Sequence, residues 1–318
     1  MGVAGLPAQK ERKMSLDIFW QIVMLLFLMA VGYAACKARV LTPSLQRGIS
    51  NLVIHVALPA SIIGSAKNMQ DSGSTAEIAT IFVGAVIYFV VAIVIMELGT
   101  RWLSIEHKQK VALRLMVVFT NCAFIGYPIL SVFLPDNGVF YGSFFLLASH
   151  IALFTYALGI TSGKSSVSFK SIVFNINNIA SLCMLIMFLF GISLPIEMTR
   201  GLDLLGGLCT PLSMLVVGGM LASVKLKRVF TLPIAYLASL LRLIVIPSLV
   251  FLALRVLGIG GAAGTVLLLQ SGMPCSGTVV MLAEKGDCAP ETVANGAMLS
   301  TLLFMGTIAY LVFLQSML

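Results

Sequence analysis

The chain has 318 residues, of which 59% are hydrophobic and only 10% are charged, and its mean hydropathy is +1.05. A soluble domain of this length needs far more charge on its surface. The composition therefore excludes an ordinary soluble protein and predicts an all-α protein that crosses a membrane several times. A transmembrane barrel is excluded too, because the apolar runs do not alternate with polar residues.

The net charge of +8 would also fit a nucleic-acid partner. The basic residues stand in short loops between the apolar runs, however, where they set membrane topology, so we expect a lipid bilayer and no nucleic acid. The six cysteines show no CxxC spacing and predict neither a disulfide framework nor a metal site. Motifs of hydrolases, zinc proteases and nucleotide-binding enzymes are missing from the sequence, so we expect no enzyme activity and no cofactor.

Ten apolar runs follow one another along the chain, each near the roughly 20 residues that a helix needs to cross a hydrocarbon core. The predicted spans are Leu16–Ala35, Leu45–Ala66, Ala76–Leu98, Val111–Leu134, Val139–Ile160, Ile172–Leu194, Leu204–Ser223, Leu232–Leu257, Ala262–Ala283 and Thr292–Leu314. Residues 1–15 form a basic tail. The run after it is longer than the core of a signal peptide, which is about 7–15 residues, so we expect it to remain as the first span.

Most lysine and arginine residues in the loops and at the ends of the spans follow an odd-numbered span. They include Lys37, Arg39 and Arg47, then Arg101, Lys108, Lys110 and Arg114, then Lys164 and Lys170, then Lys225, Lys227 and Arg228, and finally Lys285. Loops rich in these residues stay in the cytoplasm. We therefore expect a multi-pass protein of the cell membrane with both termini outside.

Prolines recur at matching places in the two halves of the chain. Pro59 and Pro211 lie in the second and seventh spans, and Pro128 and Pro274 lie in the fourth and ninth. Because five is an odd number, the second set of five spans must enter from the opposite side. The pattern predicts inverted repeats over residues 16–161 and 172–318, joined by a short loop at 162–171. Such repeats are typical of secondary transporters.

The fourth and ninth spans carry helix-breaking residues where leucine would be usual. A proline removes one backbone donor and displaces the carbonyl four residues earlier, here that of Phe124 or Gln270. In lipid each unsatisfied group costs several kcal/mol, so such breaks persist where protein or a wet cavity satisfies them. The residues around the breaks are small or polar: Asn121, Gly126, Gly272, Ser276, Gly277 and Thr278. We therefore expect the two broken helices to cross closely and to direct the positive ends of their second halves toward an anionic substrate.

Three ionisable residues fall well inside predicted spans. Arg242 in the eighth span is either a functional group or a cap for carbonyls freed at a helix break, and the sequence leaves both readings open. His55 and His150 could carry protons, although a neutral histidine bonded between helices is the more common arrangement. All three are candidates for ion or proton coupling.

Five stretches in order resemble the auxin efflux carrier family, which includes plant auxin exporters and bacterial permeases for malate and malonate. They are NLVIHVALPAS, TNCAFIGYPIL, CTPLSMLVVGGMLAS, LRLIVIPSL and QSGMPCSGTVVMLAEKGDCAPETVANGAMLSTLL. The resemblance implies ten helices in two inverted repeats, with the fourth and ninth broken and crossing at the substrate site. It also implies a dimerising scaffold from helices 1, 2, 6 and 7, a transport subdomain from helices 3–5 and 8–10, and an elevator movement.

The resemblance assigns individual residues to this site. Asn121 matches the asparagine that binds the substrate carboxylate in the plant proteins, Pro128 and Pro274 match the crossing prolines, and Gln270 resembles a polar residue of the ninth helix. The long cytosolic loop of many plant exporters is absent, and 161–170 stands in its place. This difference weakens auxin itself as the substrate.

Together these observations predict a secondary transporter for a small organic anion, a mono- or dicarboxylate such as malate, malonate or an auxin-like acid. The predicted substrate-binding residues are Asn121, Gly126, Pro128, Gln270, Gly272, Pro274, Ser276 and Thr278. Three alternatives stay open: a sodium-coupled carrier of the bile-acid type, an anion channel, and a membrane sensor that binds an anion without moving it.

Overall fold

The computed structural model describes residues 8–69, 75–162, 173–222 and 231–318, with side chains from residue 19 onward and without those of residues 68 and 69. Parts of the sequence predictions lie outside these ranges. They are the first seven residues of the tail, residues 163–171 of the connecting loop, and the span ends Ile172 and Ser223.

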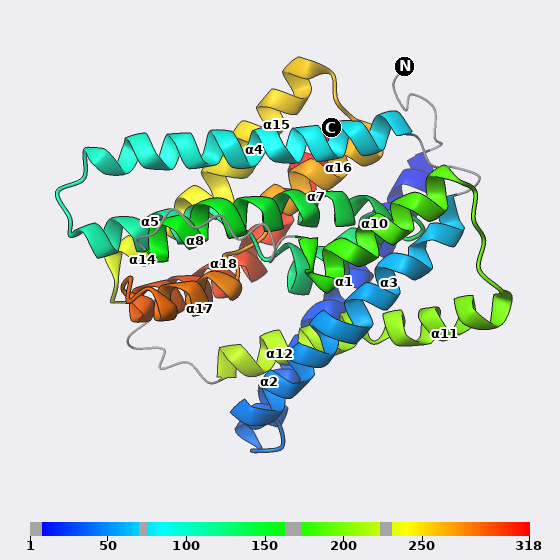
Figure 1. Ribbon diagram of the computed structural model, residues 1–318, viewed down its shortest axis with the longest axis horizontal. Coiled ribbons are helices and arrows are strands. Elements are labelled where there is room, and N and C mark those ends of the chain that lie inside the picture. Colours follow the sequence, from blue (N-terminus) through cyan, green and yellow to red (C-terminus); the bar gives the residue numbers. More distant parts are fainter. Residues whose placement is uncertain (1–7, 70–74, 163–172, 223–230) are drawn as a thin grey trace.

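Every regular element in the described ranges is a helix (Figure 1). In chain order the elements are α1 (Ala8–Lys37), α2 (Pro43–Leu52), η1 (Val53–Ala57), α3 (Leu58–Gly64), η2 (Ser65–Met69), α4 (Thr75–Arg101), α5 (His107–Val118), η3 (Cys122–Gly126), α6 (Tyr127–Phe133), α7 (Gly138–Ala152), η4 (Leu153–Ala157), α8 (Leu158–Ser162), α10 (Ile176–Leu189), α11 (Ile196–Gly207), α12 (Cys209–Ala222), α14 (Pro233–Leu240), η5 (Leu241–Val245), α15 (Ile246–Leu257), α16 (Gly261–Ser271), α17 (Thr278–Lys285) and α18 (Pro290–Ser316). No β-strand occurs in these ranges.

Seven helical segments are long and apolar enough to cross a membrane. They are Phe19–Lys37, Pro43–Lys67, Thr75–Arg101, Gly138–Ser162, Ile196–Ala222, Pro233–Leu257 and Pro290–Ser316. The fourth, sixth and ninth predicted spans overlap the shorter apolar helices Cys122–Phe133, Ile176–Leu189 and Gly261–Ser271. The prediction of an all-helical, multi-pass membrane protein is confirmed.

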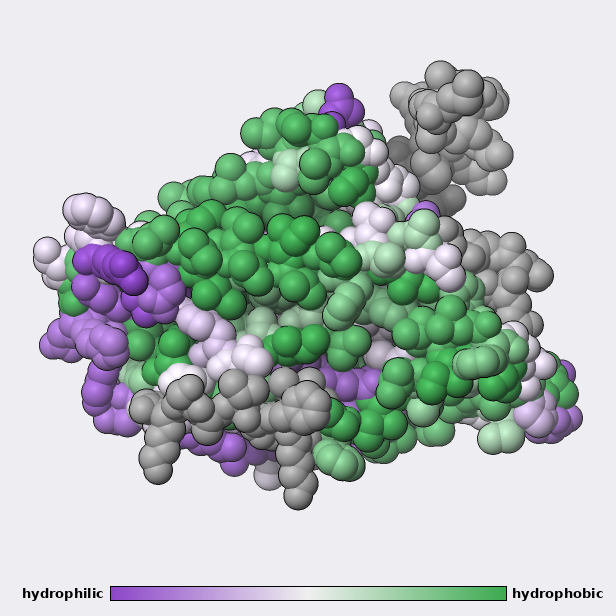
Figure 2. Space-filling model, turned by 45° about the horizontal axis from the view of Figure 1, so that its top comes forward, coloured by the Kyte–Doolittle hydropathy of each residue, from purple (hydrophilic) through white to green (hydrophobic). Residues whose placement is uncertain are grey.

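Helix α4 shows how such a segment serves two environments at once. Its buried residues include Ile78, Ile81 and Ala85, which recur at the three- and four-residue spacing of one helix face. Its other faces carry exposed apolar residues such as Val83 and Ile87. A helix that is apolar on all sides suits a site between protein and lipid. Figure 2 shows the result as a broad apolar surface, with hydrophilic residues gathered mainly at one end of the visible face.

Helices α1 and α12 pack very closely because each presents a glycine to the other. A side-chain carbon on Gly32 would overlap the backbone of Leu215, and one on Gly218 would overlap the backbone of Met29. Small residues allow this close approach between helices in a membrane, where packing takes the place of the hydrophobic effect.

The packing divides the helices into two groups (Figure 1). In the first, α1 lies along α12, and α3 lies against α10 and α11. In the second, α4 packs on α5, α7 and α16, and α14 packs on α18. The groups meet where α12 contacts η3, where α1 contacts α6 and where α7 contacts α3 and α10.

Candidate functional site: the crossing of two interrupted helices

Two helices are interrupted at the centre of the second group, and the interruptions contact each other. Helix α5 ends at Val118 and helical structure resumes at Cys122, whereas α16 ends at Ser271 and α17 begins at Thr278. Between them, Thr120 and Cys275 form an isolated antiparallel bridge.

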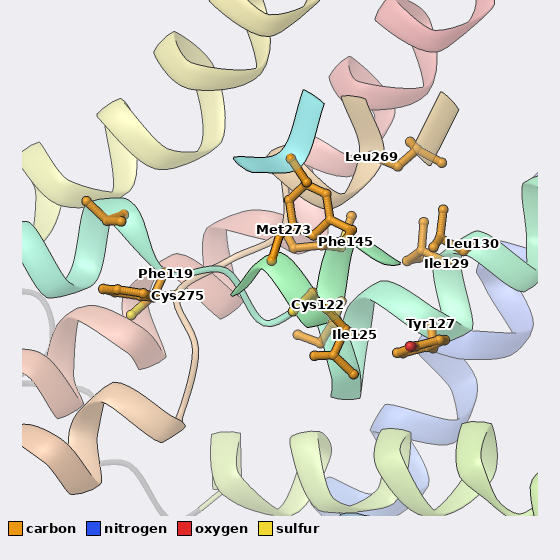
Figure 3. Close-up of a cluster of buried hydrophobic side chains, with 14 of the residues drawn as sticks. Phe119, Cys122, Ile125, Tyr127, Ile129, Leu130, Phe145, Leu269, Met273 and Cys275 are labelled. Carbon is orange, nitrogen blue, oxygen red and sulfur yellow. The ribbon is translucent and has the colours of Figure 1, made fainter. Parts of the chain in front are cut away.

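Two backbone hydrogen bonds hold this bridge. The Asn121 N–H donates to the Pro274 carbonyl oxygen at 2.7 Å, and the Ser276 N–H donates to the Phe119 carbonyl oxygen at 3.0 Å. Figure 3 shows the side chains of Phe119 and Cys275 side by side at this point. Each extended segment thereby provides hydrogen-bond partners for backbone groups of the other. Lipid could not provide such partners.

The two prolines hold different positions relative to the crossing. Pro274 lies in the extended segment, but Pro128 is the second residue of α6, beyond the π-helical turn η3. Within the continuous helical segment Cys122–Phe133, the π-helical turn before the proline changes the local hydrogen-bond pattern and accommodates the ring without ending the helix. The chains therefore meet at Thr120 and Cys275, and the sequence-based placement of the crossing at Pro128 is displaced by about two turns.

Asn121 is half-buried and caps the helix that follows it. Its Oδ1 accepts a hydrogen bond from the Phe124 N–H at 3.2 Å, as capping asparagines commonly do. The cap uses the carbonyl oxygen of the side-chain amide, so its NH₂ group is left to donate to another molecule.

On the opposite segment, Ser276 plays a related part at the start of α17. Its Oγ accepts a hydrogen bond from the Thr278 N–H at 3.2 Å. Ser276 is half-buried, while Gly277 and Thr278 are exposed. The crossing thus brings Asn121, Pro274 and Ser276 together, with Thr278 next to them on α17.

Gln270 and Gly126 are buried and pack against each other. Gln270 is fully buried; its Nε2 donates to the Cys122 carbonyl oxygen at 3.4 Å, and its Oε1 has no hydrogen-bond partner. A side-chain carbon on Gly126 would overlap this amide, so glycine is required where the glutamine packs. Gly272 packs on the Leu311 side chain instead.

Arg242 is also fully buried, and backbone carbonyls surround its guanidinium group. Its Nη1 donates to the Val117 carbonyl oxygen at 2.7 Å, its Nε donates to the Met273 carbonyl oxygen at 2.9 Å, and its Nη2 donates to the Ser271 carbonyl oxygen. Nη1 also lies 3.4 Å from the Val118 carbonyl oxygen. Arg242 therefore caps both α5 and α16. From the prolines, the sequence predicted free carbonyl groups at Phe124 and Gln270. Arg242 binds other carbonyl groups, which belong to the ends of α5 and α16 and to Met273.

The two histidines lie away from the crossing bonds. His55 is exposed on η1, where its Nδ1 lies 3.0 Å from the Asn51 carbonyl oxygen of its own helix. His150 on α7 is half-buried, with its Nδ1 2.6 Å from Oδ1 of Asn178 on α10. His150 thus joins the two groups of helices, whereas His55 touches neither the crossing nor the interface between the groups.

A cavity of about 250 Å³ opens between the two groups, beside the second half of the interrupted α5–α6 segment. Tyr127 and Ser131 line one wall, and α3 and α11 supply the other. Its charged residues are Lys67, Asp136 and Asp203, with Lys67 and Asp203 forming an ion pair. With two acids and one base, this cavity does not favour an anion. Within the described ranges, no cluster of histidine, cysteine and acidic residues could hold a metal ion.

Sequence reasoning missed two residues that support the crossing. The Tyr88 hydroxyl lies 2.7 Å from Arg242 Nη1, and Ser300 Oγ accepts a hydrogen bond from the Cys275 N–H at 3.1 Å. Both are polar groups within membrane-spanning helices, α4 and α18. Tyr88 is isolated among apolar residues, which was a signal available in the sequence, whereas Ser300 stands next to Thr301 and carries no such signal.

These features define a polytopic helical membrane protein with paired, interrupted helices. The chain belongs to a family described as membrane transport proteins, which it matches twice, over residues 17–171 and 160–312. The resemblance to the auxin efflux carrier family is thereby confirmed, and the protein is a membrane transporter.

Two archaeal proteins are similar to the chain over most of its length. One is an uncharacterized transporter of Methanocaldococcus jannaschii, 26% identical over 299 residues, which cover 88% of this chain and 93% of that protein. The other is an uncharacterized transporter of Methanothermobacter thermautotrophicus, 26% identical over 285 residues, which cover 89% and 93%.

Proposed function

We propose that this transporter carries a small organic anion, which binds where Asn121 and Ser276 meet. The observation that carries the proposal is the geometry of Asn121. Its backbone N–H donates to the Pro274 carbonyl oxygen, and its side-chain oxygen caps the next helix. Its side-chain NH₂ group takes part in neither of these hydrogen bonds. A carboxylate is an acceptor that such a donor can bind.

The helix ends at the crossing support the same ligand. The segment Cys122–Phe133 and helix α17 both begin there, and the N-terminal end of a helix carries a partial positive charge. Discontinuous helices that direct their N-termini at anionic substrates are a recurring site in secondary transporters. The two family matches, one in each half of the chain, agree with two copies of one repeat.

We further propose that the chain crosses the cell membrane ten times as two inverted five-helix repeats, with both termini outside. The first group of helices, spans 1, 2, 6 and 7, would be a scaffold that forms a homodimer. The second group, spans 3–5 and 8–10, would carry the anion past it in an elevator movement. The separate packing of the two groups supports this division, and so does the cavity between them.

The test is uptake of labelled organic acids into proteoliposomes under an imposed pH gradient. The Asn121→Ala variant loses a hydrogen bond to a charged group, which is worth about 1.5–3 kcal/mol. We expect its KM to rise about 10- to 100-fold, since 1.4 kcal/mol is a factor of ten. Asn51→Ala, at an exposed asparagine on α2, is the matched control and should transport normally.

Each alternative outcome has a distinct meaning. Equal uptake by Asn121→Ala and wild type would contradict the proposed site. Flux measurable as a continuous ion current would identify a channel, and strict dependence on sodium would identify a sodium-coupled carrier.

A further inference from the structure

Arg242 is a buried cation without a buried anion. None of the ion pairs among the residues that the structure describes includes it, and it is the one charged residue among those that are buried there. An isolated buried charge is costly, so its compensation must come from dipoles or from a ligand. The carbonyl oxygens of Val117, Ser271 and Met273 supply the dipoles.

The helix ends at the crossing allow a simple charge balance. Each helix end is equivalent to about half an elementary charge, negative at the C-terminus and positive at the N-terminus. Helices α5 and α16 bring two negative ends, and Cys122–Phe133 and α17 bring two positive ends. Without Arg242 these four ends would cancel, and a crossing of two broken helices would have little preference for anions.

Arg242 changes this balance because it binds only the C-terminal ends. Its single positive charge offsets the two negative ends, so the two positive N-terminal ends remain unopposed. Their sum is about one positive charge.

We propose that Arg242 is the positioning residue that gives the crossing its anion preference and limits it to one negative charge. The inference rests on the proposed function and narrows its substrate class to monovalent carboxylates. A dianion would bring a second negative charge into a half-buried site where no second positive charge offsets it. Arg242 contacts α4, α5 and α16 and therefore belongs to the second group of helices. In the proposed elevator movement the charge of Arg242 therefore moves with the substrate, and the crossing is close to neutral when loaded and carries about one positive charge when empty.

The test compares three probes that differ in charge more than in shape: propionate, malonate and monomethyl malonate. Binding to the purified protein is measured by calorimetry at a pH where malonate is divalent. We expect monomethyl malonate and propionate to bind at least tenfold more tightly than malonate. Tighter binding of malonate that is lost in Asn121→Ala would overturn the charge limit and leave the proposed site standing. If none of the probes binds, the proposed function fails and the charge limit with it.

Variants of Arg242 separate charge from structure. Arg242→Lys keeps the charge but cannot reach all the carbonyls, so affinity should fall while the preference for monovalent probes stays. Arg242→Met should lose anion binding. Arg255→Met, on the neighbouring helix α15, is the control, because Arg255 is exposed and donates to the Met317 carbonyl oxygen. If Arg242→Met does not fold, Arg242→Gln decides the matter, because it keeps a side-chain donor but removes the charge. The proposal predicts that Arg242→Gln loses most of its affinity for anions, whereas a purely structural role predicts wild-type affinity in the folded variant. A folded Arg242→Met that binds monomethyl malonate as wild type does would overturn the proposal.

Discussion

The backbone N–H of Asn121 donates to the carbonyl oxygen of Pro274, with 2.7 Å between the two atoms. This bond joins residues from opposite halves of the chain, and it makes the position of the Asn121 side chain depend on the ninth span. The site therefore exists only when both interrupted helices are folded and crossed. Substitutions that disturb the crossing should affect stability and transport together.

Gly126 is the first such position. Replacing Gly126 with alanine places a methyl group on the buried amide of Gln270. Overpacking of this kind costs about 1–3 kcal/mol, so we expect a lower midpoint of thermal unfolding in detergent. Gly99→Ala is the control, because nothing lies within 4 Å of the added carbon and alanine favours a helix. Equal unfolding midpoints for the two variants would show that Gln270 moves aside at no cost.

A polar cluster near the end of α4 should contribute measurably to stability. Arg114 Nη1 lies 2.7 Å from Glu97 Oε1, and the Tyr156 hydroxyl lies 2.7 Å from the same oxygen. Arg114→Met leaves Glu97, 29% exposed, without its cation, and should cost about 1–3 kcal/mol. Replacing both Arg114 and Glu97 with methionine should recover part of this loss of stability, because no unpaired charge then remains. A double variant less stable than Arg114→Met would contradict this reading.

The hydrogen bond between His150 and Asn178 should favour the state seen in the structure. It joins α7 to α10 across the two groups, so a relative movement of the groups must break it. Asn178→Ala should lose about 0.5–1.5 kcal/mol of this preference, a shift of up to about tenfold toward other states. Pulsed spin-label distances between α7 and α10 would measure the shift. Distance distributions unchanged by the substitution would show that the bond does not hold the groups in place.

The sequence predicted the structural features that depend on the type of side chain. Proline and glycine within apolar runs predicted which spans are interrupted. The length of the apolar runs predicted most of the helices. The position of the crossing was missed, because Pro128 is accommodated within a helical turn and the extended residues before it, Phe119 and Thr120, carry no backbone signal.

The role of Arg242 could not be read from the sequence for a related reason. Its partners are backbone carbonyls of Val117, Ser271 and Met273, and any residue offers a carbonyl. The sequence showed that the arginine was isolated in a span, and it therefore left cap and function as equal readings. In the structure Arg242 is a cap, because its guanidinium group binds carbonyls at the C-terminal ends of α5 and α16. That position also supports the proposed role of Arg242 in anion binding.

The central claim is that an anion binds beside the Asn121 side chain, and Asn121→Asp tests it most directly. The substitution keeps the size of the side chain and the acceptor for the helix cap, but places a negative charge where the carboxylate of the substrate is expected. Two like charges about 4 Å apart repel by about 4 kcal/mol at the effective dielectric constant of a protein site.

The measurement is equilibrium binding of monomethyl malonate to wild type, Asn121→Asp and the control Asn51→Asp. We predict that Asn121→Asp weakens binding by more than about 100-fold, while Asn51→Asp binds as wild type does. Wild-type affinity in a folded Asn121→Asp protein would contradict the claim and place the anion elsewhere in the molecule.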